Sequence, residues 1–337
     1  MEVETMDKIA YISGGTVVYW NSIVLTLAAA TAICFFLAFY IGKGGNVAAG
    51  FAAVPIALVL SLVAARFFHW YCRFDSYDSF LDAMTNYSTG GYALMGCFLG
   101  CFLTACVLWL IRLHRSLGEM LDCMCIAGCA GIAVGRLASF FNASDRGQVL
   151  ESLRTLPFAY PVTNAVSGAV EYRLATFVIQ AMVAAALFVC LGIFYIRGSR
   201  KETLKNGDTC LIFLLLYGAS QVVLDSTRYD SLFFRSNGFV SVVQVLGALG
   251  MGLAIGVFSH RMVKARGFRF WQVLLWILIA AGIGCGGFME YYVQRRGNEA
   301  AFAYSVMSGC LAAVALLTML IRFLAVKAER KQANSVG

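Results

Sequence analysis

The sequence contains few charged residues. Asp, Glu, Lys and Arg make up 13% of its 337 residues, whereas hydrophobic residues make up 60% and the mean hydropathy is +0.77. A soluble chain of this length does not need so much apolar surface, but a protein that crosses a membrane several times does. A net charge of +8 would suggest nucleic acid as the partner of a soluble protein. Here the basic residues lie mostly in short loops between apolar runs, so we expect a membrane and no nucleic acid.

Histidine is also scarce, which argues against a metal site. The three histidines are His69, His114 and His260, and Cys123-x-Cys125 lacks both the spacing and the histidines of a zinc site. The cysteines lie almost all inside apolar runs, where they act as small packing residues. We therefore expect neither a metal ion nor a cofactor.

The first residues lack the basic start of a cleaved signal peptide. They include Glu2, Glu4, Asp7 and Lys8, so we expect the first apolar run to stay in the protein. The sequence also lacks low-complexity tracts, convincing internal repeats and a soluble domain. Residues 142–173 form the only segment long enough for a small cap outside the membrane.

Nine apolar runs are long enough to cross a bilayer. They cover residues 17–41, 47–71, 92–111, 119–141, 174–196, 209–225, 239–259, 270–289 and 303–324. Because each run is continuously apolar rather than alternating, the predicted fold class is all-α, a polytopic transmembrane helix bundle. Three glycine pairs with Gly-x-x-x-Gly spacing predict close helix contacts. These pairs are Gly96/Gly100, Gly131/Gly135 and Gly252/Gly256.

The distribution of lysine and arginine predicts the orientation. With the N-terminus outside, fifteen of these residues fall on the cytoplasmic side and nine on the outer side, and Arg66 and Arg136 lie within spans. The excess of positive charge in cytoplasmic loops favours an outer N-terminus and a cytoplasmic, basic C-terminal tail.

Polar residues inside the predicted spans or at their outer ends converge at one level, within the outer leaflet. They are Asn21, Arg66, Arg136, Gln180, Gln221, Asp225, Arg228 and Gln244. An arginine at the centre of a span costs roughly 2.5–3.5 kcal/mol, so it is tolerated where it faces protein or holds an anion. The guanidinium fork suits phosphate, and we interpret these residues as a site for a lipid head group. The alternatives are arginines that snorkel to the interface, or a structural network in which Arg66 or Arg136 pairs with Asp225.

Several motifs resemble one family. The run from Gly135-Arg136 to Asn142 and Gly147 resembles the signature of the prolipoprotein diacylglyceryl transferases, G-R-x-G-N-F-x-N-x-E-x-x-G. Further segments follow the family's motifs in the same order, over roughly residues 17–260. These are Ala65-Arg66-Phe67-Phe68, Gly90-Gly91-Tyr92-Ala93-Leu94-Met95-Gly96, Leu121-Asp122, Tyr217-Gly218-Ala219-Ser220-Gln221 with Asp225 and Arg228, and Gln244-Val245-Leu246.

The resemblance implies a seven-helix body over residues 1–265, which leaves residues 266–337 as a two-span extension. It implies transfer of the diacylglyceryl group of phosphatidylglycerol to the lipobox cysteine of a prolipoprotein, in the bacterial cytoplasmic membrane. Arg136 would be catalytic, because it would hold the phosphate and stabilise charge on the leaving group. The implied substrate-binding residues are Arg66, Asn142, Gly147, Gln221, Asp225, Arg228 and Gln244.

The chain departs from the family pattern at several of these positions. Gln221 stands where the family has an arginine, and Met95 stands where it has a histidine. The remaining replacements are Asn21 for a tyrosine, Ser139 for an asparagine, and Ser144 and Gln180 for glutamates; Asp145 adjoins Ser144. His69 is the candidate replacement base, although a histidine with an ordinary interfacial partner is the alternative. The alternative function is a non-catalytic protein of the same fold that binds anionic phospholipid or a lipoprotein signal segment. A transporter is disfavoured, because few charge pairs or helix breaks lie near the midplane.

Overall fold

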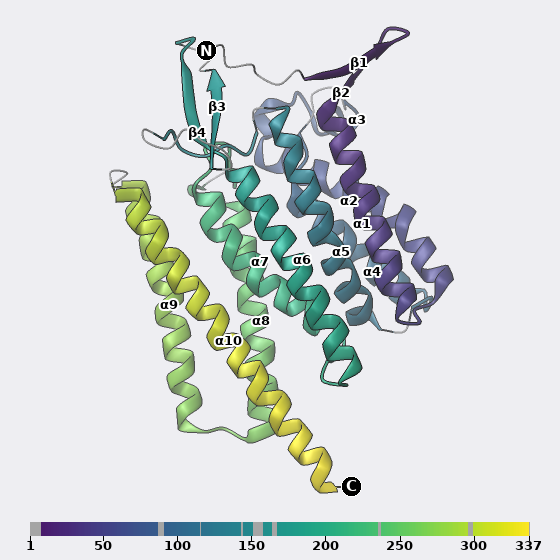
Figure 1. Cartoon of the computed structure of the whole chain (residues 1–337), viewed down its shortest axis with the longest axis vertical. Helices are drawn as coiled ribbons and strands as arrows, with labels where there is room; N and C mark the ends of the chain where they lie inside the picture. Colours follow the sequence, from purple (N-terminus) through teal and green to yellow (C-terminus); the bar gives the residue numbers. More distant parts are fainter. Residues whose placement is uncertain are drawn as a thin grey trace. The chain divides into compact units, whose positions relative to one another are not determined.

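The computed structural model describes residues 8–86, 91–114, 116–142, 144–150, 158–163, 167–234, 237–295 and 299–336. Within these residues each of the nine apolar runs corresponds to one long helix (Figure 1), although several runs extend a few residues beyond the helix ends. The helices are α1 Trp20–Gly42, α2 Val47–Cys72, α4 Leu94–Leu110, α5 Leu117–Arg136, α6 Thr176–Arg200, α7 Asp208–Ser226, α8 Val242–Arg266, α9 Phe270–Arg295 and α10 Ala300–Val336. Gly90 and parts of the predicted cap, residues 151–157 and 164–166, lie outside the described residues.

Eight of these helices are long and apolar enough to cross a membrane, with mean hydropathies of 1.6 to 2.5. The other one, α4, has 17 residues, and at 1.5 Å per residue it is about 26 Å long, near the lower limit for a span. The prediction of a polytopic transmembrane helix bundle is therefore confirmed. The last helix is longer than predicted, because residues 325–336 are rich in strong helix formers such as Ala, Lys, Glu and Gln.

Short elements connect the long helices. Three two-stranded antiparallel hairpins pair β1 Ile9–Ser13 with β2 Thr16–Tyr19, β3 Ala159–Thr163 with β4 Val170–Leu174, and β5 Phe233–Phe234 with β6 Asn237–Ser241. Helix α3 covers Phe80–Thr85, and 3-10 turns cover Phe74–Ser76 (η1) and Leu137–Phe140 (η3). The first predicted span began at residue 17, but Gly14 and Gly15 adopt positive φ in a hairpin turn and the helix starts only at Trp20.

The chain packs as two compact units. Unit 1 contains Met1–Arg197, Leu204–Cys210 and Thr227–Gly238, and unit 2 contains Gly198–Thr203, Leu211–Ser226 and Phe239–Gly337. The predicted boundary at residue 265 stays a prediction.

Glycine contacts hold α2 and α4 together in unit 1. A Cβ atom on Gly96 would lie 2.3 Å from the Cα of Ala65, and one on Gly100 would lie 2.4 Å from the Cα of Ser61. No side chain fits at these distances, so the two backbones touch as the Gly-x-x-x-Gly spacing predicts. On α5, a Cβ on Gly131 would lie 2.9 Å from the Cβ of Ala32 in α1.

In unit 2 the close contact involves a different pair. A Cβ on Gly218 of α7 would lie 2.5 Å from the carbonyl oxygen of Gly247 in α8. The prediction for Gly252 and Gly256 is wrong, since no described atom lies within 4 Å of a Cβ built at either one. Spacing alone does not say which face of a helix meets a neighbour.

Candidate functional site

The signature loop begins where α5 ends at Arg136. A 3-10 turn follows, and the Oδ1 atom of Asn142 then accepts a hydrogen bond from the Ser144 amide at 2.9 Å and another from the Ser144 hydroxyl. This local turn is one that Asn side chains favour. Asp145 has a φ of +58°, a conformation that is costly for most residues with a side chain but less so for Asp. The loop is fastened by a hydrogen bond from the Phe177 amide to the Asp145 carbonyl, at 3.2 Å.

Asp145 joins two arginines from distant parts of the chain. Its Oδ1 atom lies 2.8 Å from Nη1 of Arg136 and 2.7 Å from Nη2 of Arg228. Its Oδ2 atom accepts a hydrogen bond from the Ser139 hydroxyl at 2.9 Å. Asp230 accepts from Arg228 at 3.0 Å through Oδ1 and from the Asp145 amide at 2.9 Å through Oδ2. These contacts hold two positive charges beside each other at the end of α5.

The arginines also set the protonation state of Asp145. Burial by itself raises the pKa of this carboxyl group, but Arg136 and Arg228 outweigh burial and lower the pKa to about 2. A carboxylate with a depressed pKa stabilises the folded state above its unfolded pKa, about 4, and loses that contribution as the pH falls to its folded pKa.

We therefore expect acid to destabilise unit 1 between about pH 4 and pH 2, by about 2 kcal/mol from this group. Thermal unfolding of the detergent-solubilised protein along this pH series measures the loss. Asp145→Asn is the control, because it has no carboxyl group to titrate at this position. An identical pH dependence in wild type and variant would contradict the assignment.

Gly147 lets the loop lie against the strand segment that carries Arg228. Its amide donates to the carbonyl of Leu174 at 2.8 Å, and its backbone forms a β-bridge with Arg228. A Cβ at this position would lie 2.7 Å from Oγ1 of Thr176 and 3.0 Å from the carbonyl oxygen of Thr227. A glycine is therefore required for Arg228 to reach Asp145.

Gly147→Ala is expected to destabilise the protein by about 1–3 kcal/mol, because the added methyl group would lie 2.7 Å from Oγ1 of Thr176, 2.8 Å from Cβ of Leu174 and 3.0 Å from the carbonyl oxygen of Thr227. Gly128→Ala is the matched control: no described atom lies within 4 Å of that Cβ, and alanine favours the helix. Thermal unfolding of both variants measures the difference. If Gly147→Ala unfolded at the same temperature as Gly128→Ala, the close approach would not matter.

Arg66 is 1% exposed and has main-chain partners in unit 1. Its Nε atom donates to the carbonyl of Ala83 at 2.5 Å, Nη1 to Gly91 at 3.0 Å and Nη2 to Asn86 at 2.6 Å. The guanidinium thus binds the end of α3 to the start of the α4 segment. A substrate-binding role for Arg66 stays a prediction.

The positions that depart from the family pattern are occupied by residues with local partners or by apolar side chains. His69 lies in the last turn of α2, and its Nδ1 atom is 2.8 Å from the hydroxyl of Tyr77. Met95 is half-buried in the first turn of α4. Asn21 accepts a hydrogen bond from Ser22 at 3.2 Å. Gln180 in α6 is 1% exposed.

Three predicted site residues belong to unit 2. Gln221 and Asp225 are buried in α7. Gln244 forms a capping box with Ser241 at the start of α8, and its Nε2 atom donates to the carbonyl of Val222 at 3.1 Å. Both polar atoms of the Gln244 amide thus have protein partners. Substrate-binding roles for Gln221, Asp225 and Gln244 stay predictions.

The central acid of the cluster was not identified from the sequence. The structural alternative named Asp225 as the partner of Arg66 or Arg136 and did not name Asp145, whose carboxylate lies 2.8 Å from Arg136. One signal was present, since Asp145 is the only acidic residue between Gly135 and Gly147. Asp230, two residues after Arg228, was also missed.

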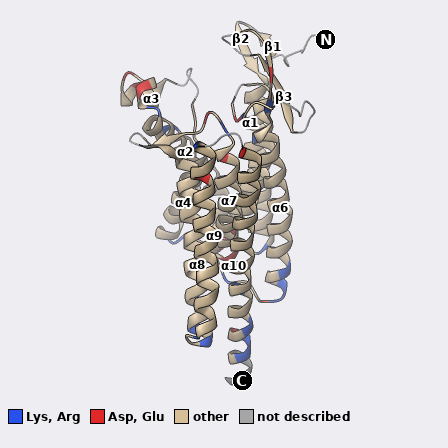
Figure 2. Cartoon of the chain, turned by 90° about the vertical axis from the view of Figure 1, so that its left-hand side faces the viewer, with Lys and Arg blue, Asp and Glu red and all other residues tan. Residues whose placement is uncertain are grey.

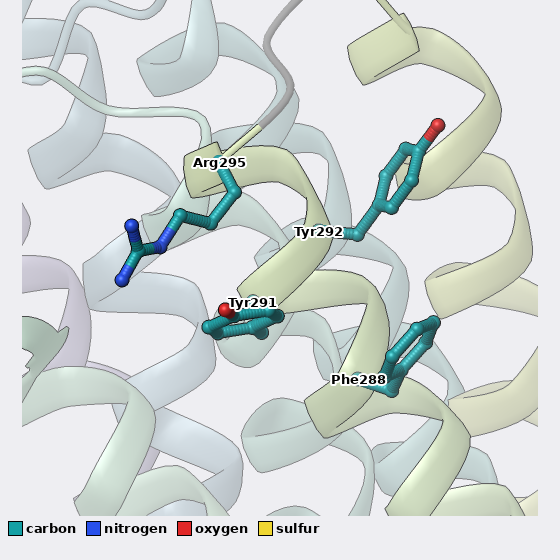
Figure 3. Close-up of a pocket in the computed structure, with 4 residues that line it drawn as sticks. All are labelled: Phe288, Tyr291, Tyr292 and Arg295. Atoms are coloured by element: carbon teal, nitrogen blue, oxygen red, sulfur yellow. The ribbon is translucent and has the colours of Figure 1, made fainter.

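A separate pocket of about 440 Å³ lies on α9 in unit 2. Phe288, Tyr291, Tyr292 and Arg295 line it (Figure 3). The Arg295 guanidinium lies 5.6 Å from the centre of the Tyr291 ring. Aromatic side chains at a helix end are typical of a membrane interface, and the pocket lining contains no carboxylate, histidine or cysteine.

Apolar spans, with two arginines sharing one carboxylate at a helix end, define a polytopic membrane protein with a charged cluster beside its spans. The family model described as prolipoprotein diacylglyceryl transferase matches residues 8–260. The chain belongs to this family of transferases, which confirms the resemblance seen in the motifs. Helices α9 and α10 lie beyond the matched residues.

Individual relatives carry the name of the same family. The chain is 25% identical to the phosphatidylglycerol–prolipoprotein diacylglyceryl transferase of Clostridium kluyveri over 268 residues, which cover 78% of this chain and 99% of the relative. It is 22% identical to the enzyme of that name from Bacillus licheniformis over 275 residues, 80% of this chain and 98% of the relative. For the Streptococcus pneumoniae enzyme the identity is 27% over 214 residues, 62% and 77% of the two chains.

Proposed function

We propose that this protein transfers the diacylglyceryl group of phosphatidylglycerol to the lipobox cysteine of a prolipoprotein. The family match supports the reaction class. The observation that carries the proposal is the meeting of Arg136 and Arg228 on Asp145, because guanidinium groups suit phosphate and these two lie together at the end of a span.

In this reaction the cysteine sulfur attacks the glyceryl carbon that bears the phosphate. A C–S bond forms, the C–O bond to the phosphate breaks, the thiol loses its proton, and glycerol phosphate leaves with the bonding electron pair. Arg136 stabilises the negative charge that grows on the departing phosphate. Asp145 positions Arg136 and Arg228, and Gly147, which has no side chain, allows the segment that carries Arg228 to lie close to the loop. His69 is the proposed acceptor of the thiol proton.

The second candidate is a non-catalytic protein that binds anionic phospholipid or a lipoprotein signal segment. The residues at two positions favour it: Gln221 cannot supply positive charge and Met95 cannot move a proton. Such a protein would keep the arginine cluster and bind the lipid without transferring its diacylglyceryl group.

We also propose that the protein lies in the bacterial cytoplasmic membrane with its N-terminus outside and its C-terminus in the cytoplasm. Basic residues support this orientation for unit 2. Arg261, Lys264 and Arg266 lie in the last turns of α8, and Lys327 and Arg330 lie in the C-terminal part of α10 (Figure 2). The Nε atom of Arg266 donates to the carbonyl of Leu324 at 3.2 Å, so these helix ends lie together, as one cytoplasmic end requires.

A transfer assay tests the proposed reaction. Purified protein is mixed with phosphatidylglycerol and a lipobox peptide, and the peptide mass is measured. A diacylglyceryl adduct that is absent with a Cys→Ser peptide supports the transferase. Bound phosphatidylglycerol without an adduct supports the second candidate. Neither an adduct nor binding would contradict both.

A further inference from the structure

Arg146 is the arginine of the signature loop that has no carboxylate partner among the described residues. Its side chain is buried, with 4% of its surface exposed. Nη2 donates to the carbonyl oxygens of Ser139 at 3.2 Å and Asn142 at 2.5 Å, whereas Nε and Nη1 have no hydrogen-bond partner. A buried charged donor without an acceptor is costly, so its presence in a native site needs an explanation.

Aromatic rings cover the guanidinium without satisfying these donors. The Arg146 Cζ atom lies 4.2 Å from the centre of the Tyr160 ring and 5.9 Å from that of Phe177. A ring stacked on a guanidinium meets its face, while the N–H bonds point outward in the guanidinium plane. The Tyr160 hydroxyl itself donates to the carbonyl of Phe140 at 3.2 Å.

Each oxygen atom of the two nearby carboxylates, those of Asp145 and Asp230, already accepts a hydrogen bond from another group. Asp145 accepts from Arg136 and Arg228 on one oxygen and from Ser139 on the other. Asp230 accepts from Arg228 on one oxygen and from the Asp145 amide on the other. Neither carboxylate contacts Nε or Nη1 of Arg146.

We propose that Arg146 binds an ionised phosphate oxygen of the substrate through one of its two unsatisfied donors, Nε or Nη1. The inference rests on the proposed function in that the phosphate is that of phosphatidylglycerol, which carries one negative charge. Both donors carry the guanidinium charge, and an ionised phosphate oxygen accepts a short, charge-assisted hydrogen bond from such a group. Both are covered by protein, so the incoming phosphate must displace the atoms that cover them. Exclusion of water would then strengthen the interaction.

The test compares phosphatidylglycerol with diacylglycerol of the same acyl chains, which lacks the phosphate. The ratio of the two dissociation constants is measured in mixed micelles for wild type, Arg146→Gln and Arg146→Lys. We expect Arg146→Gln to reduce the preference for phosphatidylglycerol at least tenfold, and Arg146→Lys to keep part of it. Arg173→Gln is the matched control, because Arg173 already has Glu171 at 3.0 Å.

The outcomes separate this inference from the proposed reaction. An unchanged lipid ratio in Arg146→Gln overturns the role of Arg146, even if transfer activity is intact. A reduced ratio supports it, even if the wild type forms no adduct. A variant that is less stable but keeps the wild-type ratio shows a purely structural role for Arg146 and also overturns the proposal. A wild type without preference for phosphatidylglycerol overturns it as well. Added inorganic phosphate distinguishes the sources: competition shows that the site takes free phosphate as well, and its absence shows that the site takes only the lipid's phosphate.

Discussion

Asp145→Asn is expected to destabilise the folded protein by about 3 kcal/mol or more. The change leaves Arg136 and Arg228 close together without the charge that both share at 2.8 and 2.7 Å. Removing one partner of a buried ion pair typically costs 3–5 kcal/mol, and Arg228 keeps Asp230 at 3.0 Å, so we expect a loss at the lower end of this range. Thermal or denaturant unfolding of the purified protein at neutral pH measures the loss.

A second carboxylate in unit 1 provides the control for Asp145. Glu171 also pairs with an arginine, Arg173, at 3.0 Å, but both side chains are about a quarter exposed. Exposed pairs contribute roughly 0–1 kcal/mol, so Glu171→Gln should change stability little. Equal losses of stability in Asp145→Asn and Glu171→Gln would show that binding two arginines does not make Asp145 more stabilising than an exposed ion pair.

Arg136→Lys is expected to reduce diacylglyceryl transfer by about 10²–10³-fold, the usual cost of losing one charge-stabilising donor. Lysine keeps the charge but not the planar fork, so it cannot bind Asp145 and a phosphate oxygen with separate, fixed N–H groups. The peptide adduct formed per unit time at saturating phosphatidylglycerol gives the comparison. If the protein proves to bind lipid without transfer, the same variant should weaken its affinity for phosphatidylglycerol.

Arg295→Lys provides the control for Arg136. This arginine lies on α9, beyond the residues that match the family, and stacks on Tyr291. Its replacement should leave transfer unchanged. If Arg136→Lys transferred as fast as Arg295→Lys, the proposed catalytic role of Arg136 would be contradicted.

The family's motif residues were found in the sequence, but their contacts were not. Arg136, Asn142, Gly147 and Arg228 were all named, and three of them directly shape or contact the Asp145 cluster. Asn142 instead orders the turn that precedes Asp145. Arg66, placed by motif in the same site, binds the carbonyl groups of Ala83, Asn86 and Gly91. A motif gives the residue type, whereas the partner depends on which loops fold back onto it.

The sequence by itself determined the membrane class, the positions of the nine long helices and the family. This follows because a run of about 20 apolar residues in lipid must satisfy its own backbone hydrogen bonds, which a helix does. Only the tertiary structure decided that Asp145 is the shared acid, that Arg146 lacks one, and that Gly218 rather than Gly252 touches a neighbouring helix. These outcomes depend on which residues meet across gaps of tens of positions, such as the 82 between Asp145 and Arg228, and local sequence does not encode that meeting.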